Sequence, residues 1–246
     1  MREYRCFLPD VRSPGEVLPL PLEEARHLVQ VLRAGPGREV LVLDGAGREW
    51  RAEVAEAGRR TASVRILEIS RTAPPPAPRW LACALTKSAR FDDMLQQAVE
   101  VGMTAFFPLL TDRTEVHPDA RRAEKRIERW RRLAAEALKQ CERLWLPEFH
   151  APAGLGDHLA MAGEHGVRRI ALMERIPPDG PGLPDLPAGE GVCLYIGPEG
   201  GWSEGERELL GRGGVERVSL GTEAVLRTET AALAGLAQLM AVPRRG

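Results

Sequence analysis

The sequence predicts two domains, a small β-barrel over residues 1–72 and an α/β domain over residues 80–246 in which helices cover a parallel sheet. A proline-rich linker at residues 73–79 separates them, because a run of prolines cannot continue a helix or a central strand. Before the linker the apolar pattern is that of short strands. After it, strand-like and helix-like patterns alternate, which is typical of a parallel sheet.

The first domain contains one helix and three strands by pattern. Residues 22–34 are predicted to be helical, with Glu23 and Glu24 in the first turn and Gly35 directly after the end. The strand-like runs are residues 39–43, 50–55 and 61–69, and a glycine-rich turn at residues 44–47 joins the first two. Short strands around a small core favour a compact barrel.

In the second domain, strands are predicted at residues 80–85, 105–110, 169–173, 192–196 and 217–220. Helices are predicted at residues 91–101, 119–141, 155–164, 204–211 and 228–240. The last helix is apolar nearly all round and rich in small residues, so it is expected to be buried on most sides. Its neighbour is either another element of the domain or a second copy of the chain.

Composition restricts the classes of function. The chain has 246 residues, 43% of them hydrophobic, and a net charge of −1, so binding to nucleic acid would require a local basic surface. Four scattered cysteines without partners at zinc spacing predict buried thiols and no metal site. The longest apolar stretch, residues 231–242, is shorter than the roughly 20 residues that cross a bilayer. We therefore expect a cytoplasmic protein without a membrane role.

Two strand–loop–helix junctions carry the chemistry. The first reads Ile196-Gly197-Pro198-Glu199-Gly200-Gly201-Trp202-Ser203-Glu204, in which the glycines would let a ligand approach the backbone and Ser203 would cap the next helix. The second, residues 220–231, places Arg227 beside the positive end of a helix that begins at Thr228. Such a locally unfavourable charge is a candidate for a functional one. A plain turn and a surface arginine are the alternative interpretations.

Basic residues gather at two further places. Residues 121–132 hold seven basic side chains against Glu124 and Glu128, either as a phosphate-contacting surface or, more commonly, as a solvated helix face. The segment 87–90 adds Lys87 and Arg90 near the expected ligand edge. Neither dinucleotide nor triphosphate fingerprints occur, which argues against a nucleotide-dependent oxidoreductase.

These segments together resemble the RsmE family, the uridine-N3 methyltransferases of small-subunit ribosomal RNA within the knotted SPOUT superfamily. Residues 196–201 resemble its cofactor loop and residues 226–231 its final loop and helix start, while Arg26-His27-Leu28 and Val31-Leu32-Arg33 resemble the signature of its RNA-binding module. Gln97 stands where the family usually has Lys, and Lys139 stands where it usually has Glu.

The resemblance implies a trefoil knot in the parallel sheet, a homodimer, and S-adenosylmethionine as cofactor. The cofactor would lie among three loops of the C-terminal domain and contact Met173, Glu174, Ile196, Gly197, Pro198, Gly200, Gly201, Leu220, Gly221, Leu226 and Thr230. Ribosomal RNA of the small subunit would be bound through Arg26, Arg33, Lys87, Arg90 and Arg113.

The reaction that the resemblance implies needs help at the nucleophile, because uridine N3 carries a proton. Arg227 is the candidate cation for the developing imide anion, and Glu199 is the candidate base. Two alternatives remain: a knotted methyltransferase that acts on tRNA or another ribosomal site, and a non-catalytic RNA-binding protein. Cofactor binding would exclude the second of these.

Overall fold

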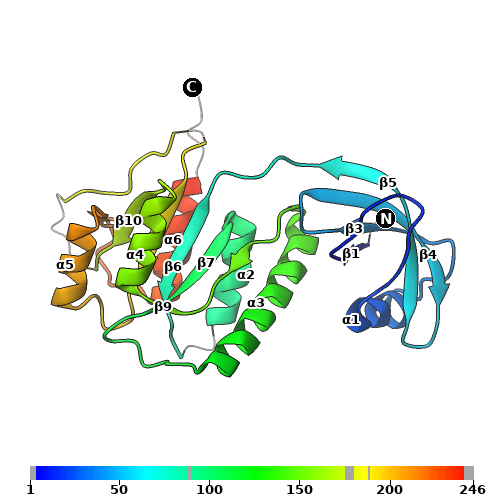
Figure 1. Ribbon diagram of the computed structural model, residues 1–246, viewed down its shortest axis with the longest axis horizontal. Coiled ribbons are helices and arrows are strands. Elements are labelled where there is room, and N and C mark those ends of the chain that lie inside the picture. The colour runs from blue at the N-terminus through cyan, green and yellow to red at the C-terminus, as the bar shows by residue number, and fades with distance from the viewer. Residues whose placement is uncertain (1–3, 88–89, 175–179, 188, 241–246) are drawn as a thin grey trace. The chain divides into compact units, whose positions relative to one another are not determined.

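The computed structural model describes residues 4–87, 90–174, 180–187 and 189–240. The chain divides into two compact units, the first of Met1–Pro76 and Ala135–Leu146 and the second of Ala77–Ala134 and Pro147–Gly246 (Figure 1). Sequence analysis had assigned residues 135–146 to the C-terminal domain. They pack with the first unit because Trp145 Nε1 donates to the carbonyl of Ala73 at 3.0 Å and the Leu146 amide donates to Gly45 at 2.9 Å.

The first unit is built on a five-stranded sheet. Its strands are β1 (Arg5–Phe7), β2 (Val17–Pro19), β3 (Glu39–Leu43), β4 (Arg48–Ala57) and β5 (Ala62–Thr72), in the order β1-β3-β4-β5-β2. Only the β1–β3 pair is parallel among these pairings. The three predicted strands are confirmed. β1 and β2 were not predicted, because three residues are too few for an alternating pattern.

The predicted helix over residues 22–34 is shorter and less regular than expected. An α-helix, α1 (Leu22–Arg26), runs into a π-helical turn, η1 (His27–Val31). The helix ends there because Arg33 adopts a left-handed conformation with φ +53°, and the Ala34 amide donates to the carbonyl of Leu28 at 3.1 Å. Sequence propensity alone does not predict this ending, since arginine seldom takes a positive φ.

The second unit contains the predicted parallel sheet. Its strands are β6 (Arg79–Ala84), β7 (Ala105–Leu110), β8 (Glu148–Phe149), β9 (Ala153–Gly154), β10 (Arg168–Leu172), β11 (Val192–Ile196) and β12 (Glu216–Val218). The order is β12-β10-β11-β6-β7-β8, with β9 also paired to β7, and every pairing given is parallel. The two-residue strands β8 and β9 were not predicted.

Helices cover both faces of this sheet (Figure 1). They are α2 (Phe91–Val101), α3 (Ala120–Cys141), α4 (Leu155–Glu164), α5 (Glu204–Arg212) and α6 (Thr228–Met240), close to the predicted ranges. On one face α6 packs on α2, β6 and β11, and on the other α4 packs on α5 and β7. No helix within the described ranges is both long and apolar enough to cross a membrane.

The helix α6 buries one face rather than most of its sides. Thr228, Ala232, Gly235, Leu236 and Leu239 face the interior of the unit. A Cβ atom on Gly235 would lie 2.8 Å from Leu194 and 3.0 Å from Leu172, so glycine is what allows α6 to approach β11 and β10 so closely. The opposite side includes the exposed Ala237 and Gln238.

Candidate active site

A cleft lies at the carboxyl ends of the neighbouring strands β10, β11 and β12, the edge where parallel sheets bind ligands. It holds about 570 Å³ of empty space, including its open mouth. Three loops and the start of α6 form its walls. The lining residues are Leu172, Met173, Glu174, Ile196, Gly197, Pro198, Glu199, Ser219, Leu220, Thr222, Ala224, Val225, Leu226, Thr228 and Ala231.

The loop after β11, residues 197–203, is fixed by the buried indole of Trp202. Its Nε1 donates to the carbonyl of Leu172 at 3.1 Å, and the ring packs so closely that a Cβ on Gly197 would lie 3.0 Å from it. Ser203 then begins α5 with a capping box, as predicted: its hydroxyl accepts from the amide of Glu206, and that glutamate accepts from the amide of Ser203 at 2.8 Å. The loop is therefore tied to β10 at one point and to α5 at the other.

The loop after β7 braces the same segment from outside. Arg113 donates to the carbonyl of Gly200, and the hydroxyl of Ser203 donates to Asp112 at 2.5 Å. The buried carboxylate of Glu206 also accepts from the amide of Asp112 at 2.9 Å. Both oxygens of Glu206 thus hold backbone amides from two separate segments, which keeps the cleft wall in place.

Gly201 lies against Glu174, which belongs to the loop after β10. Gly201 has φ +71°, and a Cβ added to it would lie 2.5 Å from both carboxylate oxygens of Glu174. Only glycine combines this backbone conformation with this close approach. Glu174 therefore lines the cleft, whereas Gly201, which it contacts, does not.

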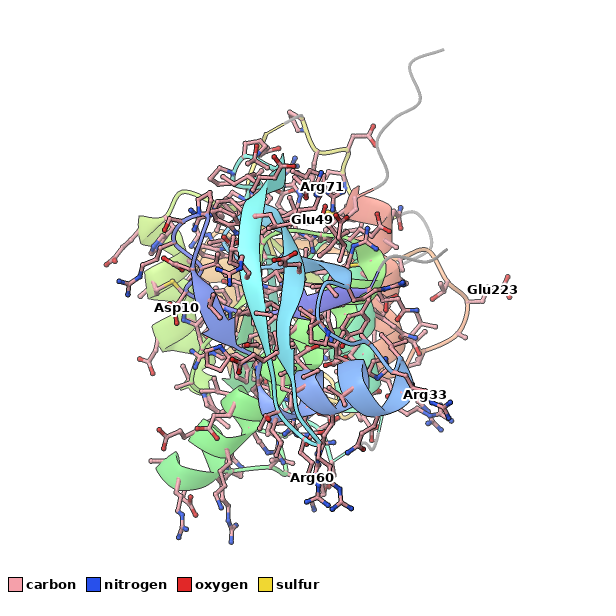
Figure 2. All side chains as sticks on the ribbon, turned by 90° about the vertical axis from the view of Figure 1, so that its right-hand side faces the viewer. Asp10, Arg33, Glu49, Arg60, Arg71 and Glu223 are labelled. Atoms are coloured by element: carbon pink, nitrogen blue, oxygen red, sulfur yellow. The ribbon has the colours of Figure 1, made fainter. Side chains whose placement is uncertain are left out.

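The third wall is the loop of residues 219–227 and the first turn of α6. Thr228 is buried and its hydroxyl donates to the carbonyl of Gly197 at 3.1 Å, which joins this wall to the second loop. The neighbouring Glu229 is also buried and accepts from the hydroxyl of Thr86 at 3.2 Å. Burial raises the pKa of the Cys83 thiol, and the Glu229 carboxylate raises it further. Figure 2 shows Glu223 at the outer end of the loop, pointing away from the molecule.

The two predicted catalytic residues are both exposed, and one of them lines the cleft. Glu199 is exposed and belongs to the lining. Arg227 is exposed and stands between two lining residues, Leu226 and Thr228. In the described parts of the chain the Arg227 guanidinium makes no ion pair, so its charge is free to act on a ligand.

The structure brings most of the predicted cofactor residues together. Those that line the cleft are Met173, Glu174, Ile196, Gly197, Pro198, Leu220 and Leu226. The lining, as far as the structure describes it, leaves out Gly200, Gly201, Gly221 and Thr230. Gly200 accepts a hydrogen bond from Arg113, and Gly201 lies against Glu174. The loop after Glu174 lies outside the described residues up to position 179.

The predicted RNA-binding cations occur in both units. Arg26 pairs with Glu23 at 3.2 Å, while Arg33 is exposed beyond η1, where Figure 2 shows it pointing outward. Lys87 pairs with Glu115 at 2.9 Å, and both side chains are exposed. Ser88 and Ala89, beside Arg90, lie outside the described residues.

Several lining residues were not predicted from the sequence. Leu172, Ser219, Thr222, Ala224, Val225 and Ala231 all belong to the cleft. The sequence predicts Leu172 within a strand, and its position as the last residue of β10 puts it at the ligand edge. Val225 is 63% exposed, and a single exposed apolar residue in a loop is too common to indicate a ligand contact from the sequence.

Comparison with known proteins agrees with this geometry. The family described as RNA methyltransferase domain matches residues 73–240, and the family described as RNA methyltransferase PUA domain matches residues 20–67. The chain is 36% identical to ribosomal RNA small subunit methyltransferase E of Synechocystis sp. over 97% of this chain and 78% of the relative. It is 28% identical to the Bacillus subtilis protein of the same name, over 88% and 87% of the two chains. The S-adenosyl methionine-bound structure of the Neisseria gonorrhoeae protein of that name superposes with TM-score 0.82 at 30% identity, over 96% of both chains.

Proposed function

We propose that this chain, which belongs to the ribosomal RNA small subunit methyltransferase E family, methylates N3 of one uridine in 16S ribosomal RNA. Its class is that of an S-adenosylmethionine-dependent RNA methyltransferase of the small ribosomal subunit. The choice of uridine and of its N3 atom is our proposal. The observation that carries it is a cleft built from three strand-end loops. The exposed Glu199 lines this cleft, and the exposed Arg227, which makes no ion pair within the described residues, stands between two of its lining residues.

The lining of the cleft fits the cofactor in chemistry, since it combines apolar side chains with a few polar groups. Ile196, Leu220 and Leu226 offer an apolar seat for the adenine. The carboxylate of Glu174, which lies against Gly201, would accept hydrogen bonds from hydroxyl or amino groups of the ligand.

Glu199 and Arg227 would act on the uridine. When bound, S-adenosylmethionine supplies a methyl group that its sulfonium already activates. Glu199 would accept the N3 proton, and Arg227 would stabilise the negative charge that spreads to the neighbouring carbonyl oxygens. Thr228 and Trp202 would hold the two cleft walls in register, so that the uridine nitrogen is aligned with the methyl group.

RNA recognition would be shared between the units. Residues 1–72 form the proposed RNA-binding domain, residues 73–79 the linker and residues 80–246 the methyltransferase domain. The family match at residues 20–67 supports this division. Arg26 and Arg33 would contact RNA from the first unit, and Lys87, Arg90 and Arg113 from the second. A cytoplasmic location follows from a ribosomal substrate and is part of the proposal.

A homodimer and a trefoil knot complete the proposal. The side of α6 that faces away from its own unit carries the half-buried Ala234 and the exposed Ala237, which are small enough for close helix contact. The knot would lie where the loops at residues 197–203 and 219–227 are joined by the Thr228–Gly197 hydrogen bond.

The test is transfer of labelled methyl groups to small ribosomal subunits purified from cells that lack the enzyme, followed by nucleoside analysis. We expect label in N3-methyluridine alone. Label on another base, or only on tRNA, would refute the substrate assignment. A protein that fails to bind S-adenosylhomocysteine would instead be a non-catalytic RNA-binding module.

A further inference from the structure

A second hollow lies on the outer side of the loop at residues 197–203. It is an open groove lined by Arg113, Trp202, Glu204, Arg207, Glu208, Gly211 and Arg217. Its three arginines come from three separate elements: the loop after β7, the helix α5 and the strand β12. Arg207 and Arg217 have no part in the proposed cofactor chemistry, whereas Arg113 also braces the cleft wall through Gly200.

The groove and the cofactor cleft share one wall. Trp202 lines the groove, and its ring packs on Gly197, which lines the cleft. Arg113 lines the groove and donates to Gly200 in the same loop. The loop at residues 197–203 therefore separates the cofactor cleft from the groove and its arginines.

The charge of the groove is only partly balanced. Glu208 pairs with Arg212 on its own helix at 3.0 Å, whereas Glu204 makes no ion pair with any residue that the structure describes. Arg207 and Arg217 are exposed, and within the described ranges neither guanidinium makes an ion pair. Elsewhere in this unit exposed arginines do pair, as Arg122 does with Asp119 at 3.4 Å.

We propose that this groove binds the phosphodiester backbone of the RNA substrate and so leads the target nucleotide to the cleft. The inference rests on the proposed function. Guanidinium groups present planar donors that match phosphate oxygens, and three of them at one groove can hold consecutive phosphates. With a net charge of −1, the chain must bind RNA through local cations such as these. Because only the loop at residues 197–203 separates the groove from the cleft, a nucleotide next to the bound phosphates would reach the cleft.

The groove is tested with the full chain and a fluorescent oligouridylate, whose dissociation constant is measured across a salt series. Arg207→Ala and Arg217→Ala should each weaken binding about threefold to tenfold and lower the log–log salt slope by about 0.7. Arg207→Lys should keep the slope because it keeps the charge. Glu204→Gln should tighten binding, since it removes the unpaired acid. Affinity for S-adenosylhomocysteine should stay at the wild-type value in all four variants.

Arg122→Ala is the matched control, since Arg122 is an exposed arginine of α3 that pairs with Asp119 at 3.4 Å. It should change neither binding nor salt slope. If the slope falls with Arg122→Ala and not with Arg207→Ala and Arg217→Ala, the helical basic run binds the RNA and the groove proposal is overturned. Methyl transfer to small ribosomal subunits is measured in parallel. Its absence in the wild type would refute the proposed function, while the salt slopes would still judge the groove.

Discussion

Replacement of Gly201 by alanine should separate the role of a backbone conformation from the role of a close contact. The backbone at Gly201 has φ +71°, and an alanine there should lower the free energy of unfolding by about 1–2 kcal/mol. The new Cβ would also lie 2.5 Å from both oxygens of Glu174. Because such a contact cannot persist, Glu174 must leave its place at the cleft wall.

The displaced carboxylate sets the expected loss of affinity. A hydrogen bond to a charged group contributes about 1.5–3 kcal/mol, so S-adenosylhomocysteine should bind about tenfold to a hundredfold more weakly. Isothermal titration calorimetry measures that affinity, and urea unfolding measures the stability. Both are needed, because a partly unfolded protein would also bind less ligand.

Gly166→Ala is the matched control. Gly166 has φ +63°, and nothing lies within 4 Å of a Cβ placed there. It should lose the same stability without losing affinity. In a Glu174→Ala background, Gly201→Ala should weaken binding no further. Equal affinities in Gly201→Ala and wild type would refute the reasoning, since the collision with Glu174 would then have no consequence at the cleft.

Three further predictions concern other parts of the second unit. Arg227→Ala should leave cofactor affinity unchanged and slow methyl transfer about a hundredfold in single-turnover assays, as loss of one electrostatic donor does; an unchanged rate would remove Arg227 from the chemistry. Ala234→Glu should dissociate the dimer in sedimentation, because a charge would be buried without a partner, and a monomeric wild type would contradict the dimer. Burial, followed by His150, lowers the pKa of His158 to about 4, so His158 stays neutral in the fold. Stability should be fully present above the unfolded pKa of about 6.5 and fall by about 1.4 kcal/mol per pH unit as the pH drops towards 4, a loss that His158→Phe should abolish in urea unfolding.

The parallel sheet could be predicted because its central strands are unbroken apolar runs. All five residues of β11 are buried, and such a run has no alternative placement in a domain of this size. The short strands β8 and β9 could not be predicted, since two residues carry no period. The π-helical turn of η1 makes contacts with distant residues, such as the stacking of His27 on Tyr4, and helix propensity does not predict such contacts.

The loops that the sequence predicts for the cofactor line a cleft in the structure, but the sequence does not show what each glycine approaches. Among the glycines of residues 197–201, Gly197 lines the cleft. Gly200 lies close to Arg113, and Gly201 lies close to Glu174. The sequence indicates that a glycine is required, but the side chain that approaches it comes from a distant segment. The same holds for Gly235 of α6, which lies against Leu194 of β11.

The departure from the family pattern at Lys139 has a physical compensation in this chain. Lys139 Nζ lies 2.6 Å from Glu24 and 2.9 Å from Glu136, and the Lys139 side chain is only 15% exposed. Burial alone would lower the pKa of Lys139, but its bonds to Glu136 and Glu24 outweigh burial and raise it. Glu24 also accepts from the hydroxyl of Tyr4 at 3.0 Å and from the amide of Phe7 at 3.4 Å, so α1, β1 and the end of α3 meet at one carboxylate. A glutamate at position 139 would set two acids against each other beside Glu24 and raise the free energy of the fold. The lysine is therefore explained by the acid opposite it, and its role lies in holding residues 135–146 to the first unit rather than in the chemistry of the cleft.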